Sequence, residues 1–161
     1  MVEGRTLMIV DRHVSDDDYL SFYGSLSEVL QMVMDLVYLT RFNVASVLAL
    51  QGKDVQRLGI SLRRIRSTIP ARVPATRELC YVMNRCVRTN PIYGDIQSAH
   101  IIRLEDGNPM TNSEFNLLWK RYMRRWVADD GGRSAFSIRD IRMKGIADRR
   151  TGDLVTRRRG H

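Results

Sequence analysis

Apolar residues recur at every third or fourth position along most of this 161-residue chain. That spacing places them on one face of a helix, and it is the main sequence signal for helices that pack against a core. Between residues 27 and 38 the apolar positions are so dense that they predict a helix buried on most of its surface. The pattern predicts helices over residues 15–23, 27–38, 44–51, 76–86, 111–125 and 136–147.

Two of the predicted helices have clear starting signals. Ser15 precedes three consecutive acids, Asp16, Asp17 and Asp18, so a capping hydroxyl is followed by carboxylates where the helix dipole favours them. Thr111 is followed three positions later by Glu114, which is the pattern of a capping box. We therefore interpret the acidic cluster as a helix start and not as a metal site.

The segment from residue 52 to 76 has a different pattern, because Gly52, Gly59 and two prolines interrupt it. Its apolar residues lie in short runs that are typical of strands, namely Ile60, Leu62, Ile65, Ile69 and Val73. We expect a small antiparallel sheet here, basic on one face. The fold class predicted is α+β, predominantly helical with this small antiparallel sheet, in a single domain over residues 1–161.

The net charge indicates which class of molecule the protein binds. The chain has 26 Lys and Arg residues and 18 Asp and Glu residues, which gives a net charge of +8. Such a surplus is typical of a protein that binds nucleic acid, because each phosphate contact by Lys or Arg releases counterions. A basic protein without such a partner remains the alternative. No apolar run is long enough to span a bilayer, and the N-terminus lacks the pattern of a signal peptide, which predicts a cytoplasmic protein.

Several common catalytic patterns are absent from the sequence. It contains no phosphate-binding Gly-x-x-x-x-Gly-Lys, no zinc-binding set of Cys and His, and no Gly-x-Ser-x-Gly nucleophile turn. The two cysteines, Cys80 and Cys86, are expected to be small buried apolar residues and not a disulfide. The order of segments is the remaining source of information about function.

Five segments, in order, resemble the catalytic domain of the tyrosine site-specific recombinases, the phage integrase family. The first, "LVYLTRFNVASVLALQGKDV", is similar to the family pattern Leu-x-Leu-x-Thr-Gly-x-Arg-x-x-Glu-x-Leu-x-Leu-x-x-x-Asp-Val. Next, "LGISLRRIRSTIPARVPATREL" resembles the hairpin that carries a Lys-Thr in the family, and "DGNPMTNSEFNLLWKRYMRR" resembles the helix before the active-site block. Finally, "FSIRDIRMKGIAD" resembles Phe-x-x-His-Asp-Leu-Arg, and the closing "RRRGH" resembles a Leu-Leu-Gly-His step.

The resemblance implies a reaction on DNA. In the family a tyrosine attacks a phosphodiester, while two arginines, a lysine and histidines stabilise the charge on the phosphoryl oxygens and transfer protons. Double-stranded DNA is the implied partner, and another recombinase protomer is a second one. The resemblance implies no metal, no nucleotide cofactor and no small-molecule substrate.

The family's first catalytic arginine is not retained in this sequence. It falls on Asn43, which has no charge, and the acid that steadies it three positions later falls on Ser46. Because an unpaired buried charge costs several kcal/mol, the paired loss suggests a site that has settled into inactivity.

The other family positions are partly changed. The hairpin lysine falls close to Arg66, the histidine of His-x-x-Arg falls on Arg139, and the second arginine and the late histidine match Arg142 and His161. The catalytic positions implied by the resemblance are therefore Asn43, Arg66, Arg139, Arg142 and His161. The family's tyrosine helix would follow His161, so we expect that helix, and also the family's N-terminal core-binding domain, to be absent from this chain.

Three readings follow from this pattern. The favoured one is an integrase-like domain that has lost catalysis and still binds DNA, a pseudoenzyme of DNA recombination. The others are a recombinase domain completed by a tyrosine supplied in trans, and an integrase remnant or unrelated basic fold without such a function. The expected DNA contacts are Lys53, Arg63, Arg64, Arg66, Arg124, Arg125, Arg142, Arg157, Arg158 and Arg159.

Overall fold

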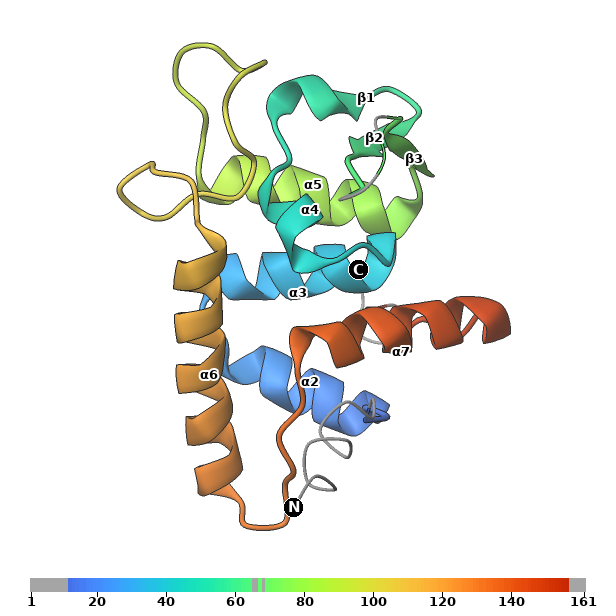
Figure 1. Cartoon of the computed structure of the whole chain (residues 1–161), viewed down its shortest axis with the longest axis vertical. Coiled ribbons are helices and arrows are strands. Elements are labelled where there is room, and N and C mark those ends of the chain that lie inside the picture. The colour runs from blue at the N-terminus through green and yellow to red at the C-terminus, as the bar shows by residue number, and fades with distance from the viewer. Residues whose placement is uncertain (1–11, 65–66, 68, 157–161) are drawn as a thin grey trace.

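A computed structural model of the chain describes residues 12–64, 67 and 69–156 (Figure 1). Within these residues, the helices before the sheet are α2 (Asp16–Ser25), α3 (Glu28–Thr40) and α4 (Val44–Leu48). A 3-10 turn, η1 (Gly52–Asp54), leads into the strands β1 (Val55–Gln56), β2 (Gly59–Leu62) and β3 (Ala71–Pro74). The last three helices are α5 (Arg77–Thr89), α6 (Asn112–Asp129) and α7 (Ile138–Thr151).

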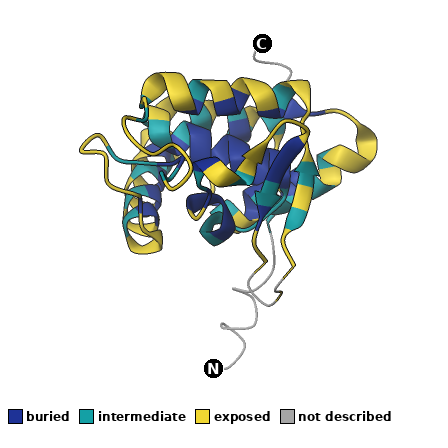
Figure 2. Cartoon of the chain, turned by 90° about the horizontal axis from the view of Figure 1, so that it is seen from above, coloured by how far each residue is buried: buried dark blue, intermediate teal, exposed yellow. Residues whose placement is uncertain are grey.

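Helix α3 lies at the centre of the molecule, with α5 along one side and α7 along the other (Figure 1). Ten of its 13 residues are buried, as the dense apolar pattern predicted. The buried set includes Asp35, whose carboxylate accepts hydrogen bonds from the hydroxyls of Tyr19 (2.9 Å) and Tyr23 (3.0 Å). These bonds explain how an acid is accommodated in the core. Viewed from above, buried residues fill the interior and exposed ones follow the rim (Figure 2).

An aromatic cluster joins α2, α6 and the segment before α7. The ring of Phe22 lies edge-on to Trp119, Trp126 and Phe136, with centroid distances of 4.9, 5.6 and 5.2 Å. Edge-to-face contacts of this kind add about 0.5–1.5 kcal/mol each to the burial of the rings. Phe136 thereby anchors the chain two residues before α7 begins.

Helices α3 and α7 approach each other very closely at Gly145. A Cβ atom built on Gly145 would lie 2.2 Å from the carbonyl oxygen of Tyr38, so the contact requires glycine. One residue earlier, the ammonium of the buried Lys144 lies 2.6 Å from Asp16 and 3.2 Å from Asp148. The hydroxyl of Tyr38 donates to Asp148 at 2.7 Å, and burial raises the pKa of Tyr38 well above its usual value. This network connects α2, α3 and α7.

The predicted antiparallel sheet is confirmed. Its order is β1-β2-β3, with Val55 opposite Ile60 and Ile60 opposite Val73. Ile69 was predicted in a strand but lies in a bend with 75% of its surface exposed, because β3 begins only at Ala71. Ile65 lies outside the described residues.

Several predicted boundaries and one burial prediction are corrected. Helix α4 ends at Leu48, earlier than predicted, because Gln51 pairs instead with His100 in an isolated β-bridge. Helix α7 continues to Thr151, where Gly152 caps it with a positive φ of 77°. Cys80 is exposed, whereas Cys86 is buried as predicted, and burial raises its pKa to about 12.

None of the helices in the described ranges of the chain has the length and apolar content needed to span a bilayer. Within the same ranges no three His, Cys, Asp or Glu residues are grouped so that they could hold a metal ion.

Candidate functional site

Asn43 and Ser46, the two positions at which the family resemblance implies an arginine and an acid, form local hydrogen bonds. Asn43 is the N-cap of α4, and its Oδ1 accepts a hydrogen bond from the backbone N–H of Ser46 at 2.9 Å. The hydroxyl of Ser46, which is 6% exposed, donates to the carbonyl oxygen of Arg63 at 2.6 Å. The two side chains therefore begin α4 and attach it to the chain that follows β2.

Replacing Asn43 by the family's arginine is expected to lower the free energy of unfolding by about 1 kcal/mol. Arginine cannot accept the bond from Ser46, and α4 carries the buried residues Val47 and Leu48 into the core. The measurement is urea unfolding of the Asn43→Arg variant. Asn43→Asp is the control, because its carboxylate can still accept the bond and should preserve stability. An Asn43→Arg variant as stable as the parent would contradict this role of the cap.

Arg142 reaches the segment that contains Asn43. Its Nε donates to the carbonyl oxygen of Arg41 at 2.7 Å, and its side chain is half-buried. Arg41 ends α3 with a positive φ of 62° and is the only non-glycine residue with positive φ in the described chain. The family pattern has glycine at this position, which suits that backbone conformation.

Arg139 lies one turn before Arg142, near the start of α7, and is exposed. The next residue, Asp140, closes a capping box with Ser137, accepting from the backbone N–H of Ser137 at 2.8 Å. It also accepts from the backbone N–H of Arg12 at 3.0 Å. These bonds fix the first turn of α7 and therefore the direction in which Arg139 and Arg142 follow each other.

The structure describes only part of the predicted hairpin segment. The carbonyl of Arg63 accepts the Ser46 bond, and the guanidinium of Arg64 lies 5.9 Å from the ring centroid of Phe42. Arg66 lies outside the described residues, and the same holds for the late family position His161 and the basic run, namely Arg157, Arg158 and Arg159. The structure thus brings together the segments around residues 41–46, 63–64 and 142.

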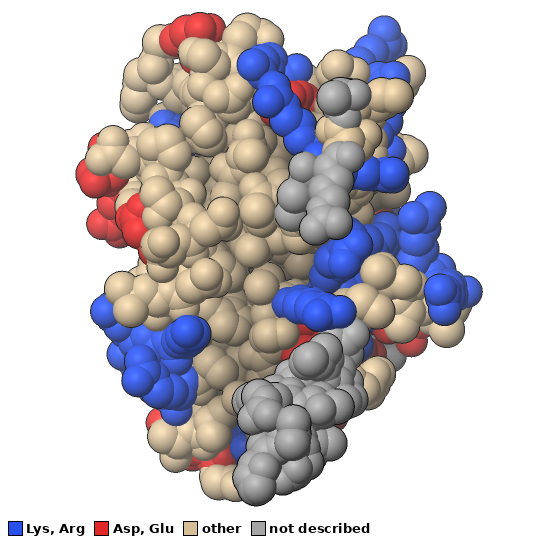
Figure 3. Space-filling view, viewed as in Figure 1, with Lys and Arg blue, Asp and Glu red and all other residues tan. Residues whose placement is uncertain are grey.

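On the face shown in Figure 3, the described Lys and Arg side chains form two groups and not one continuous patch. Lys and Arg side chains gather over α6 in one group and over the sheet and α7 in another, with uncharged surface between them (Figure 3). Arg124 and Arg125 are exposed on α6, while Lys53, Arg63 and Arg64 are exposed around the sheet. Acidic side chains gather instead over the loops between α5 and α6 (Figure 3).

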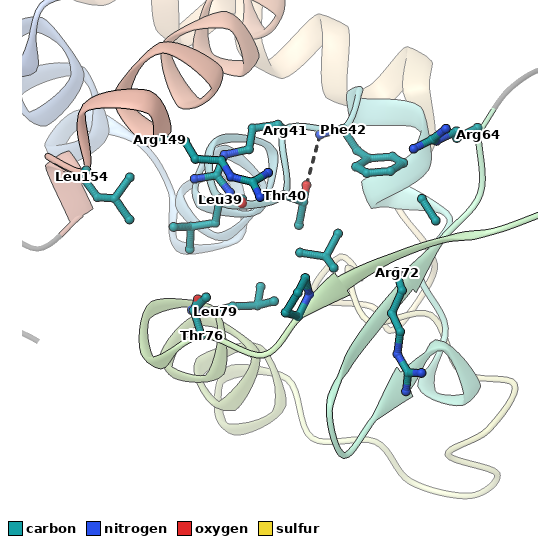
Figure 4. Close-up of a pocket in the computed structure, with 14 residues that line it drawn as sticks. Leu39, Thr40, Arg41, Phe42, Arg64, Arg72, Thr76, Leu79, Arg149 and Leu154 are labelled. Atoms are coloured by element: carbon teal, nitrogen blue, oxygen red, sulfur yellow. Dashed lines mark hydrogen bonds between the residues drawn. The ribbon is translucent and has the colours of Figure 1, made fainter.

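A pocket of about 400 Å³ lies where α3 ends, between the sheet and the C-terminal end of α7 (Figure 4). Four arginines are among its lining residues, Arg41, Arg64, Arg72 and Arg149. Of these four arginines, only Arg64 is among the DNA contacts predicted from the sequence. The one available signal was Arg41, because it replaces the glycine of the family pattern.

No family model matches the sequence, and a search of curated proteins also found no match. Solved structures do match. The catalytic core of lambda integrase superposes with a TM-score of 0.64 at 15% sequence identity, covering 89% of this chain and 90% of that one. The Tn1549 transposon integrase in complex with a circular intermediate DNA gives a TM-score of 0.70 at 11% identity, covering 90% of this chain and 55% of the integrase chain.

A third similar structure is a lambda integrase tetramer bound to a Holliday junction, with a TM-score of 0.66 at 15% identity. The match covers 86% of this chain and 42% of the integrase chain, so this sequence spans less than half the length of that protein. The predicted resemblance to a tyrosine recombinase catalytic domain is confirmed at the level of the fold.

Proposed function

We propose that this protein is an integrase-like domain that binds double-stranded DNA and does not cleave it by itself. The observation that carries the proposal is the hydrogen bonding of Asn43 and Ser46. Both side chains cap and anchor α4, at positions where the family's chemistry needs a charged arginine and its supporting acid. Exposed arginines around the sheet and on α6 retain the charge needed for phosphate contacts.

The missing charge at Asn43 also makes it less favourable that a partner protein completes the site by supplying a tyrosine. A tyrosine in trans would provide a nucleophile, but it would not restore the positive charge missing at Asn43. Removing one donor to the developing phosphoryl charge typically costs a hundredfold or more in rate. Arg139 in place of a histidine removes a group that can exchange protons near neutral pH. Binding needs only distributed charge and is less sensitive to these changes.

The similar structures support DNA as the partner, because their proteins are bound to a Holliday junction and to a circular intermediate DNA. A second protomer is also part of the proposal, since lambda integrase is seen as a tetramer and as a dimer on DNA. Residues 1–161 are proposed to act as one domain in such an assembly.

The affinity of the protein for a duplex of about 20 base pairs is expected to fall steeply as salt rises. The slope of log K against log salt should be about −0.9 for each phosphate contact. The measurement is fluorescence anisotropy at several NaCl concentrations. Replacing Arg63 and Arg64 together by glutamine should weaken binding and reduce the slope by roughly 1.8. The matched control is Arg77→Gln with Arg88→Gln, exposed arginines on α5 outside the proposed contacts.

Two results would oppose the proposal. Undetectable or salt-independent binding would remove DNA as the partner. A covalent protein–DNA adduct on denaturing gels, after incubation of the duplex with this chain alone, would show that the chain cleaves DNA. An adduct formed only when a second integrase is present would favour completion in trans.

A further inference from the structure

We propose that the pocket at the end of α3 binds a phosphate group carried on an organic molecule. It is built mainly on Arg41 and Arg149, with Arg64 on the side of the sheet. Neither Arg41 nor Arg149 is a position at which the family resemblance places a catalytic cation. The pocket adjoins the segment of Asn43 and Arg142, because Arg142 donates to the carbonyl of Arg41, but the side chains that carry its charge are different ones.

The charge of the pocket is unbalanced. Arg41 and Arg149 extend from different helices and lie beside each other on one wall (Figure 4). None of the described residues that line the pocket is acidic. The charge of Asp148 favours the Arg41 cation, but its carboxylate also accepts a hydrogen bond from the hydroxyl of Tyr38 and pairs with the buried Lys144. The pocket thus holds adjacent positive charges, for which an anion is the natural complement.

Arg41 is fixed in place before any ligand arrives. Its Nη1 donates to the carbonyl of Leu39 at 2.7 Å, and its Nε donates to the carbonyl of Gly145 at 3.2 Å. Burial and the charge of Arg149 lower the pKa of Arg41 below its usual value. An anion held beside Arg41 and Arg149 would offset the repulsion between the two cations. A donor that is already oriented also loses little conformational entropy on binding.

A third cation lies farther along the pocket, beyond Phe42 (Figure 4). The guanidinium of Arg64 lies over the ring of Phe42, which also lines the pocket. Arg72, in contrast, points away toward β1 and donates to the side chain of Gln56 at 2.8 Å (Figure 4). Arg41, Arg149 and Arg64 are therefore the groups available for the ligand.

The neutral polar groups of the pocket already have partners. The hydroxyl of Thr40 donates to the carbonyl of Leu36 at 2.6 Å, and that of Thr76 accepts from the backbone of Leu79 at 3.2 Å. Recognition thus depends on the arginines, whose planar guanidinium groups match phosphate oxygens.

Apart from Gly152, the rest of the lining is apolar. Its members are Leu39, Phe42, Ala71, Val73, Pro74, Leu79 and Leu154. A volume of about 400 Å³ is within the usual range for small-ligand pockets and exceeds what a bare phosphate needs. The ligand is therefore a phosphate ester with an organic group, supplied either by the DNA backbone or by a free phosphate compound.

The test is calorimetric titration of the full chain with inorganic phosphate and with phenyl phosphate, at constant ionic strength maintained with NaCl. Saturable binding at one site is expected, with phenyl phosphate severalfold tighter because of the apolar wall. Arg149→Gln and Arg64→Gln should each weaken binding roughly tenfold, the usual scale for losing a charged hydrogen bond. The controls are Arg150→Gln, next to Arg149 on α7, and Arg57→Gln, in the β1–β2 turn, both exposed and outside the pocket.

Absence of saturable binding would overturn the proposal, as would equal weakening by Arg149→Gln and Arg150→Gln. A second titration in the presence of saturating duplex distinguishes the sources of the phosphate. If the duplex abolishes phosphate binding, the pocket takes a DNA phosphate; if binding is unchanged, it takes a free compound. The first titration needs no DNA, so it still reports on the pocket if duplex binding fails.

Discussion

Replacing Lys144 by methionine should lower the free energy of unfolding by about 3 kcal/mol. The ammonium of Lys144 is 3% exposed and pairs with both Asp16 and Asp148, which are themselves only 24% and 16% exposed. Removing the cation takes the neutralising ammonium away from two partly buried carboxylates, and breaking a buried ion pair in this way typically costs about 3–5 kcal/mol. We expect the lower end of that range because water still reaches both acids. Urea unfolding measures the change.

Two further variants distinguish the loss of this charge network from the general effect on stability of removing a lysine. Lys120→Met removes an exposed lysine on α6 and should leave stability nearly unchanged. Adding Asp148→Asn to Lys144→Met removes one of the stranded charges, so it should recover part of the lost stability. If Lys144→Met and Lys120→Met unfold at the same urea concentration, the network has no such role.

The substitution Gly145→Ala is the second large effect that we expect, a loss of roughly 2–3 kcal/mol. The added Cβ would lie 2.2 Å from the carbonyl oxygen of Tyr38, so α3 and α7 must move apart. This displacement outweighs the gain of about 1 kcal/mol that alanine normally brings to a helix. The same shift would disturb the bond from Arg142 to Arg41, so phosphate binding should weaken as well. Thermal or urea unfolding gives the stability change.

Gly24 provides the matched control. It lies near the end of α2, and a Cβ built there would meet no heavy atom within 4 Å. Gly24→Ala should therefore keep or slightly raise stability, as helix propensity alone predicts. A loss at Gly24 equal to that at Gly145 would show that the close contact between α3 and α7 is not the cause.

Local signals in the sequence predicted most of the helices correctly. The caps at Ser15, Thr76 and Thr111 are formed by hydrogen bonds to backbone N–H groups three residues away, so their partners are determined by the chain itself. The predicted helix boundary was less accurate where a residue pairs with a residue far along the chain. Helix α4 is shorter than its apolar pattern indicates because Gln51 pairs with His100.

The candidate site likewise has features that the sequence could predict and features that only the structure could show. The sequence could show that Asn43 and Ser46 replace a charged pair, because that follows from the order of residues. It could not show that these side chains cap α4 and bond to Arg63, since this depends on where β2 ends in space. On the face shown in Figure 3, the described part of the predicted basic surface likewise forms two groups, because α6 and the sheet present their arginines at different places.

The sequence by itself determined the fold class, the helix starts and the absence of the family's charged pair. Each of these depends on residues within a few positions of one another, where backbone geometry sets the spacing. Only the tertiary structure decided that Arg41, Arg64 and Arg149 share one pocket, because packing of α3 against α7 and the sheet brings them together. Charged side chains from distant segments can bind the same ligand only when packing of the core places them close together.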